Sequence, residues 1–201
     1  IVEKGFVYRG KKPVYWSIPC RTALAEAEVE YADHISQSIF VKCPVENQKD
    51  TFIIIWTTTP WTLPANLAVA YNSQFTYVRA KVGEEIYLLE STLLPKVAET
   101  CGWENVETVA EISGTEISQL RYVHPFIDKT GPILAGDTFV ENSTGSGFVH
   151  VAPGHGLEDY GLGSQNGLPI YSPVDDAGRL AHTNDLPPES QMPTELIGKS
   201  I

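Results

Sequence analysis

Two stretches of the sequence carry side chains that could do chemistry, and the first of them is rich in threonine. It runs from Trp56 to Asn66 and follows an apolar segment at Phe52 to Ile55. Three successive threonines, Thr57 to Thr59, precede Pro60, which cannot continue a strand ladder. Their hydroxyls and backbone N–H groups are therefore available to bind a polar ligand. The alternative is a turn that satisfies itself through threonine hydrogen bonds and packs two tryptophans.

The second stretch, Gly145 to Tyr160, contains four side chains that could bind a metal ion or orient a substrate. An apolar strand ends near His150, and Glu158 and Asp159 fall in the first turn of an expected helix, where the helix dipole favours anions. A metallohydrolase could use these groups together with His155, but their spacing matches no recognised zinc motif. We therefore expect no metal. For His155 and Glu158, structural roles at the helix entry and in capping are the simpler interpretation.

Two other kinds of catalytic site find little support. Gly145-Ser146-Gly147 is not the Gly-x-Ser-x-Gly turn that presents a nucleophilic serine. The same glycines do not make a phosphate loop, because no lysine follows them and a strand, instead of a helix, comes next.

The chain has three cysteines, an odd number, at spacings that suit neither a disulfide framework nor a zinc site: Cys20, Cys43 and Cys101. Their pattern favours a reducing, cytoplasmic location.

Composition limits the classes of function. The 201 residues are 42% hydrophobic, which is enough for one globular domain with its own core and excludes disorder. No strictly apolar run is longer than that from Phe52 to Trp56, which is far shorter than a membrane span, so we expect no membrane partner. The net charge of −11 argues against a broad nucleic-acid surface, so an RNA partner would have to be bound locally. We expect a monomer, and a piece of a longer protein because the chain begins at Ile1.

Most of the chain alternates between apolar and polar residues with a period of two, which favours strands. From Ala25 to Tyr31 this alternation predicts a strand, although Ala and Glu prefer helices. Further strands are predicted at residues 14–17, 38–42, 51–57, 67–71, 76–82, 86–89, 106–111, 138–140 and 148–152. Helices are predicted from Ser91, as N-cap, to Gly102 and from Leu157 to Asn166. This pattern indicates a β-rich α+β domain, a distorted β-barrel with a few short peripheral helices.

Together the two stretches resemble the editing, or connective-peptide, domain of class I isoleucyl-tRNA synthetases. The valyl and leucyl relatives carry an arginine before the proline and an acidic residue soon after it, where this chain has Thr59 and Trp61. The resemblance extends from about Lys12 to Leu180. The synthetic motifs His-Ile-Gly-His and Lys-Met-Ser-Lys-Ser are absent, which implies the proofreading part alone of an ATP-dependent ligase of protein biosynthesis. The matching phrases are Thr57 to Asn66 and Gly147 to Tyr160, supported by Val14 to Ser17, Arg21 to Tyr31 and His124 to Phe126.

The resemblance implies the fold shared by the valyl, isoleucyl and leucyl editing domains, with residues 1–201 as a single domain and residues 1–12 and 181–201 as connecting segments. It also implies hydrolysis of valine wrongly esterified to isoleucine tRNA, and of valyl-adenylate. A hydrophobic pocket gains only about 1–3 kcal/mol from one methylene, and isoleucyl-tRNA synthetase is itself the standard case of this limit. A second site is then needed, which excludes isoleucine and hydrolyses the esters of amino acids small enough to enter it.

Roles for individual residues come with the resemblance. The expected catalytic residues are Asp159, which would pair with the α-amino group of the substrate, His150, which would reject isoleucine, Thr58 and Thr59. The mechanism would be water attack without a covalent intermediate, metal or cofactor. The partners would be the 3′-terminal adenosine of isoleucine tRNA carrying valine and the remaining domains of the parent synthetase. A silent module that only orients the tRNA end is the alternative. The expected substrate-binding residues are Thr57, Trp61, Thr62, Asn66 and Gly147.

Overall fold

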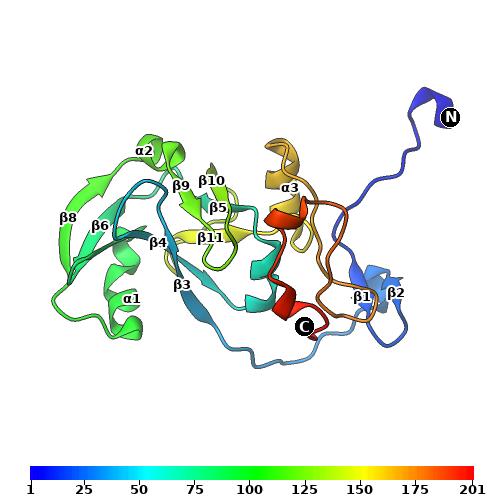
Figure 1. Ribbon diagram of the computed structural model, residues 1–201, viewed down its shortest axis with the longest axis horizontal. Coiled ribbons are helices and arrows are strands. Elements are labelled where there is room, and N and C mark those ends of the chain that lie inside the picture. The colour runs from blue at the N-terminus through cyan, green and yellow to red at the C-terminus, as the bar shows by residue number, and fades with distance from the viewer.

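The computed structural model describes residues 1–201 and contains eleven strands, three α-helices and six short 3-10 helices (Figure 1). The strands are β1 (Tyr15–Ser17), β2 (Thr22–Leu24), β3 (Ile39–Pro44), β4 (Thr51–Thr57), β5 (Ala68–Tyr71), β6 (Tyr77–Val82), β7 (Glu85–Glu90), β8 (Glu107–Ile112), β9 (Arg121–Val123), β10 (Thr130–Ala135) and β11 (Phe148–Val151). The helices are α1 (Leu94–Cys101), α2 (Gly114–Gln119), α3 (Leu157–Gln165), η1 (Val2–Lys4), η2 (Glu26–Glu28), η3 (Pro60–Ala65), η4 (Ser91–Leu93), η5 (Pro188–Ser190) and η6 (Thr194–Leu196).

The strands form three sheets. The largest has the order β3-β4-β7-β6-β8, the second has the order β11-β5-β10-β9, and β1 and β2 form a separate antiparallel ribbon. The β4–β7 and β5–β10 pairs are parallel and the other neighbouring pairs are antiparallel. A single bridge between Val45 and Tyr122 joins the two larger sheets next to β3 and β9. These two sheets therefore enclose the main core between them.

The main core takes apolar side chains from both larger sheets. Ile53 and Ile55 of β4 face it, and the alternation along that strand places them on the same side. Tyr77 is fully buried, and its hydroxyl donates to the carbonyl of Gly147 while accepting from the N–H of Asn72. A buried tyrosine needs such partners for its hydroxyl. The tyrosine therefore fixes the entry to β11 relative to β6.

The β-rich α+β class is confirmed, but no closed barrel is found among these strands. On its outer side β8 is an edge strand, because it pairs with β6 alone, and most of its residues are exposed. Glu107 and Glu111 lie on this strand, and exposed charges of this kind deter pairing with another sheet. These charges protect the edge of β8 from pairing with another chain, so the sheet need not close into a barrel to hide this edge.

Two of the predicted strands are wrong. Residues 25–31 form η2 with extended flanks, and Glu28 accepts a hydrogen bond from the Ala25 N–H through its side chain. No neighbouring strand pairs with this segment, so alternation alone cannot make it a strand. Residues 138–140 lie in a turn, where the N–H groups of Phe139 and Val140 both donate to the Gly136 carbonyl. The strands β2, β9 and β10, the helix α2 and the 3-10 helices η1, η3, η5 and η6 were not predicted.

The predicted helix near residue 91 is confirmed with a shifted start. The 3-10 helix η4 leads into α1, and Glu90, instead of Ser91, caps the start by accepting hydrogen bonds from the Thr92 and Leu93 N–H groups. Gly102 ends α1 with a φ of 65°. The helix predicted from Leu157 is confirmed as α3.

The two ends of the chain differ in how they pack. Residues 1–12 are exposed, and the part before Gly10 extends away from the body as an arm (Figure 1), whereas Lys11 pairs with Asp185 of the body. Residues 181–201 return to the body, where Met192 is buried against Ile127 and Leu180. That these ends connect to further domains stays a prediction. No helix in the structure combines the length and the apolar character that a membrane crossing requires.

Candidate functional site

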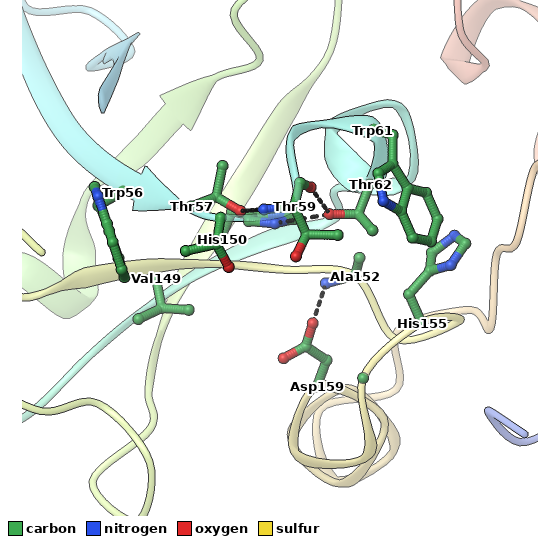
Figure 2. Close-up of a pocket in the computed structure, with 12 residues that line it drawn as sticks. Trp56, Thr57, Thr59, Trp61, Thr62, Val149, His150, Ala152, His155 and Asp159 are labelled. Atoms are coloured by element: carbon green, nitrogen blue, oxygen red, sulfur yellow. Dashed lines mark hydrogen bonds between the residues drawn. The ribbon is translucent and has the colours of Figure 1, made fainter. Parts of the chain in front are cut away.

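A cavity of about 340 Å³ opens where the carboxyl ends of β4 and β11 meet η3 and the start of α3 (Figure 2). It brings together most of the residues that the sequence predicted for a site. The lining residues are Trp56, Thr57, Thr58, Thr59, Trp61, Thr62, Val149, His150, Ala152, His155, Gly156 and Asp159.

The threonine side of the cavity is a strand end that turns into a short helix. Thr57 is the last residue of β4, and its hydroxyl oxygen accepts a hydrogen bond of 3.0 Å from the Thr59 N–H. Pro60 then takes the first position of η3, where its missing N–H costs nothing. Thr58 is exposed and Thr59 is half-buried at the rim of the cavity. The threonine hydroxyls of this turn are therefore positioned to meet a ligand.

His150 is held by a hydrogen-bonded chain that also fixes its tautomer. The Thr62 hydroxyl donates its single proton to the Thr59 carbonyl over 2.7 Å. Its 3.0 Å contact with His150 Nε2 must then use the imidazole as the donor (Figure 2). The Nδ1 atom keeps its lone pair and has no partner in the protein. Burial lowers the pKa of His150 to about 4, with His155 adding to the effect, so the ring is neutral at pH 7.

Asp159 lies across the cavity from the threonines and projects from the first turn of α3 (Figure 2). One of its carboxylate oxygens, Oδ2, accepts a 2.8 Å hydrogen bond from the Ala152 N–H just beyond β11. Burial raises the pKa of Asp159 to about 6, opposed by this hydrogen bond and assisted by the neighbouring charge of Glu158. Asp159 is thus mainly ionised at pH 7. Its other oxygen is free to pair with a cation in the cavity.

Trp61 and His155 close one side of the cavity. Their rings meet edge to face, with centroids 5.2 Å apart and an interplanar angle of 88°. Trp61 is 38% exposed, whereas the His155 Nε2 atom is buried without a hydrogen-bond partner. Burial lowers the pKa of His155 to about 4, so this ring is also neutral at pH 7. The sequence predicted only a structural role at the helix entry for His155, but in the structure its side chain lines the cavity.

Sequence reasoning also missed two apolar residues of the wall. Trp56 and Val149 line the cavity and are each half-buried. Trp56 precedes Thr57 and Val149 precedes His150, and this proximity to predicted site residues is the only indication in the sequence that they line the cavity.

Two predicted substrate-binding residues, Asn66 and Gly147, do not line the cavity. The Asn66 amide donates to the Ala68 carbonyl over 2.8 Å, and its oxygen accepts from the Tyr122 hydroxyl. Gly147 has a φ of +79°, and a Cβ atom there would lie 2.3 Å from the Glu90 Cβ. Asn66 and Gly147 therefore stabilise the backbone around the cavity. The sequence does not distinguish such a structural role from ligand binding, because either role can place an asparagine or a glycine beside a motif.

The histidine and acidic side chains of the second stretch do not assemble into a metal-binding cluster. No group of three or more His, Cys, Asp or Glu side chains is placed to hold an ion. His150 already donates a hydrogen bond to Thr62 through Nε2, and Asp159 already accepts one from the Ala152 N–H. The arrangement instead offers hydroxyl donors on one side of a small cavity and a carboxylate on the other.

Comparison with known proteins places this architecture in a family. Residues 1–171 match the family of tRNA synthetases class I (I, L, M and V). The chain is 50% identical over 180 residues to an isoleucine–tRNA ligase of Fervidobacterium pennivorans, covering 90% of this chain and 20% of that protein. It is 49% identical over 182 residues to the isoleucine–tRNA ligase of Thermotoga maritima, with the same coverage. The chain thus spans about a fifth of the length of these curated relatives.

Solved structures agree on the fold. The structure titled GlLeuRS-CP1 superposes with a TM-score of 0.55 at 14% identity, covering 67% of this chain and 66% of that chain. The editing domain of the cytosolic leucyl-tRNA synthetase of P. knowlesi superposes with a TM-score of 0.53 at 15% identity, covering 61% of this chain and 59% of that chain. The chain therefore belongs to the class I tRNA synthetases, as a segment of the isoleucyl type that has the editing-domain fold.

Proposed function

We propose that this chain hydrolyses the ester that joins valine to the 3′-terminal adenosine of isoleucine tRNA. The observation that carries the proposal is the small cavity with threonine hydroxyls on one side and the buried Asp159 carboxylate on the other. Its family membership and the isoleucine–tRNA ligase names of its relatives support the choice of tRNA. Valyl-adenylate carries the same valyl group and is proposed as a second substrate.

Asp159 selects a substrate with a free α-amino group. The carboxylate is already oriented by the Ala152 N–H, so its free oxygen can take an ammonium without reorganisation. An ammonium in contact would favour the ionised carboxylate and so lower the Asp159 pKa from about 6. The pair therefore forms most favourably near neutral pH, where the substrate amine is charged.

His150 limits the size of the amino-acid side chain. The ring is 7% exposed, and its hydrogen bond to Thr62 prevents it from rotating away. Together with Val149 and Trp56 it forms a wall that valine can contact. The additional methylene of isoleucine would have to displace packed side chains, and overpacking of this kind costs about 1–3 kcal/mol. The cavity thus prefers the smaller amino acid.

Hydrolysis requires a water molecule, an ester carbonyl and donors for the charge that develops on its oxygen. Water attacks the carbonyl carbon, the ester C–O bond breaks, and valine leaves with one oxygen from water while the ribose hydroxyl regains a proton. The hydroxyls of Thr58 and Thr59 line the cavity as donors for the developing oxyanion. His150 is a weak base because of its pKa of about 4, so we assign it a positioning role. No covalent intermediate is needed.

The whole-protein setting is part of the same proposal. The chain would act as an editing module of a larger cytoplasmic synthetase, whose other domains bind the body of the tRNA. This division explains how a chain of net charge −11 can act on RNA. The module itself is proposed to be a monomer.

The test is deacylation of valyl-tRNA and isoleucyl-tRNA, both made on isoleucine tRNA. We expect hydrolysis of the valyl ester alone, without inhibition by a chelator. Equal hydrolysis of both esters would contradict the size selection. If the chain and the synthetase containing it bind charged tRNA but hydrolyse neither ester, the chain is a silent binding module.

A further inference from the structure

A second cavity of about 820 Å³ lies beside the first. One wall is the segment Gly10 to Ile18, which includes β1, and the opposite wall is the segment Ile170 to Gly178. Trp61 and His155 line both cavities, so this edge-to-face pair is the partition between them. A ligand that fills the first cavity and continues past Trp61 enters the second.

Exposed aromatic side chains gather around this second cavity. Tyr15 is 49% exposed, Trp16 is 40% exposed and Trp61 is 38% exposed, although such side chains are normally buried. Trp16 is held in place, because its indole N–H donates to the Asp176 carbonyl over 3.1 Å. Aromatic faces that are fixed at the edge of a hollow are suited to stacking with planar groups.

The charged groups of the second cavity are mostly satisfied within the protein. Lys11 forms an ion pair with Asp185. Asp175 accepts 2.9 Å hydrogen bonds from two backbone N–H groups, those of Ala177 and Arg179. The side chains of Lys12 and Asp176 remain available. They present one cation, which suits a phosphate, and one carboxylate, which accepts from an exocyclic base amine.

We propose that the second cavity binds the unpaired nucleotides that precede the terminal adenosine of the tRNA, with a base stacked on Trp16. The inference rests on the proposed function, which places the terminal aminoacyl-adenosine in the first cavity. Stacking on an aromatic side chain and one lysine–phosphate contact give local affinity for single-stranded RNA. They do so without the broad basic surface that this acidic chain lacks.

The experiment compares two valyl esters that differ only in the preceding nucleotides. One is 3′-valyl-adenosine, and the other is the trinucleotide cytidylyl-cytidylyl-adenosine carrying valine on its 3′ end. The readout is the ratio of kcat/KM for the long and short esters. A stacked base is worth about 1–3 kcal/mol, so we expect the chain to favour the trinucleotide by about 5- to 150-fold.

Three variants assign this preference to the cavity. Trp16→Ala should reduce the ratio at least about fivefold, and Trp16→Phe should keep most of it because the ring still stacks. The matched control is Tyr8→Ala, which removes an aromatic side chain of the N-terminal arm that is 85% exposed and lies outside the cavity. It should leave the ratio unchanged. A merely structural effect of Trp16→Ala would lower both rates together and leave the ratio as it was.

Binding of the uncharged trinucleotide and of adenosine, measured by calorimetry, separates this proposal from the deacylase itself. If neither ester is hydrolysed but the trinucleotide binds more tightly than adenosine in a Trp16-dependent way, the subsite stands and the proposed hydrolysis fails. If the trinucleotide shows no advantage in either assay, or keeps its advantage in Trp16→Ala, the subsite is refuted.

Discussion

Replacing Asp159 with asparagine should lower activity and raise stability at the same time. Asparagine has nearly the same shape, and its oxygen can still accept from the Ala152 N–H. The substitution removes the charge that the substrate ammonium needs, and it also removes a charge that the folded protein holds at a cost. These two effects have different magnitudes and different pH dependences, so they can be measured separately.

The activity loss follows from the missing charged hydrogen bond. Hydrogen bonds to charged groups contribute about 1.5–3 kcal/mol, which corresponds to a loss in kcat/KM of about 10- to 200-fold. In the unmodified chain kcat/KM should also fall as pH decreases through about 6, where Asp159 takes up a proton. The variant should lack this acid limb, because asparagine does not titrate.

The stability gain follows from the raised pKa. Folding moves the Asp159 pKa from 3.8 to about 6, and each pKa unit is worth about 1.4 kcal/mol, so ionisation destabilises the fold by up to about 3 kcal/mol above pH 6. The favourable interaction of the charge with the helix dipole is already contained in the folded pKa and is not subtracted again. A gain of about 2–3 kcal/mol raises Tm by about 4–12 °C in a domain of this size.

The difference in Tm between the Asp159→Asn variant and the unmodified chain should depend on pH. Because the folded pKa is the higher one, the Tm difference should be complete above pH 6, about half as large near pH 5 and absent below about pH 4. The assays are valyl-tRNA deacylation and thermal unfolding at pH 4, 5 and 7.5. Glu158→Gln, which removes the neighbouring exposed carboxylate outside the cavity, is the control and should change neither readout strongly. Full activity of the Asp159→Asn variant, or no gain in its Tm at pH 7.5, would contradict the roles assigned to the Asp159 charge.

Three further predictions concern the supports of the site and its chemistry. Thr62→Val leaves the His150 Nε2–H without an acceptor, so chemical denaturation should show a loss of about 1–3 kcal/mol, and discrimination against isoleucyl-tRNA should weaken. Gly147→Ala should cost at least about 2 kcal/mol, since its Cβ would collide with Glu90 and its φ is positive, whereas Gly161→Ala, in open space on α3, should stabilise by up to about 1 kcal/mol. Similar unfolding curves for these two glycine variants would contradict the assignment. Hydrolysis should persist at its full rate after dialysis against a chelator, and restoration of a lost rate by added zinc would overturn the metal-free mechanism.

Much of the secondary structure and part of the site could be predicted because their signals are local. The apolar run before Thr57 predicted β4, and Gly102 marked the end of α1 by a left-handed backbone that glycine adopts without strain. The threonines and Trp61 are close neighbours in sequence, so one turn was enough to gather them. The capping box of Ser113 and Glu116 is a similar local signal for α2, although no helix was predicted there.

The order of residues specifies which side chains are available for catalysis and binding and where short segments turn, cap and end. Which of these side chains meet depends on how the sheets pack. His150 reaches Thr62, 88 residues earlier in the chain, because β11 pairs with β5 in one register. The same packing turns Asn66 toward Tyr122 and leaves the alternating segment from Ala25 to Tyr31 without a strand partner. Backbone preferences act over a few residues, whereas strand pairing and register depend on burying one shared core.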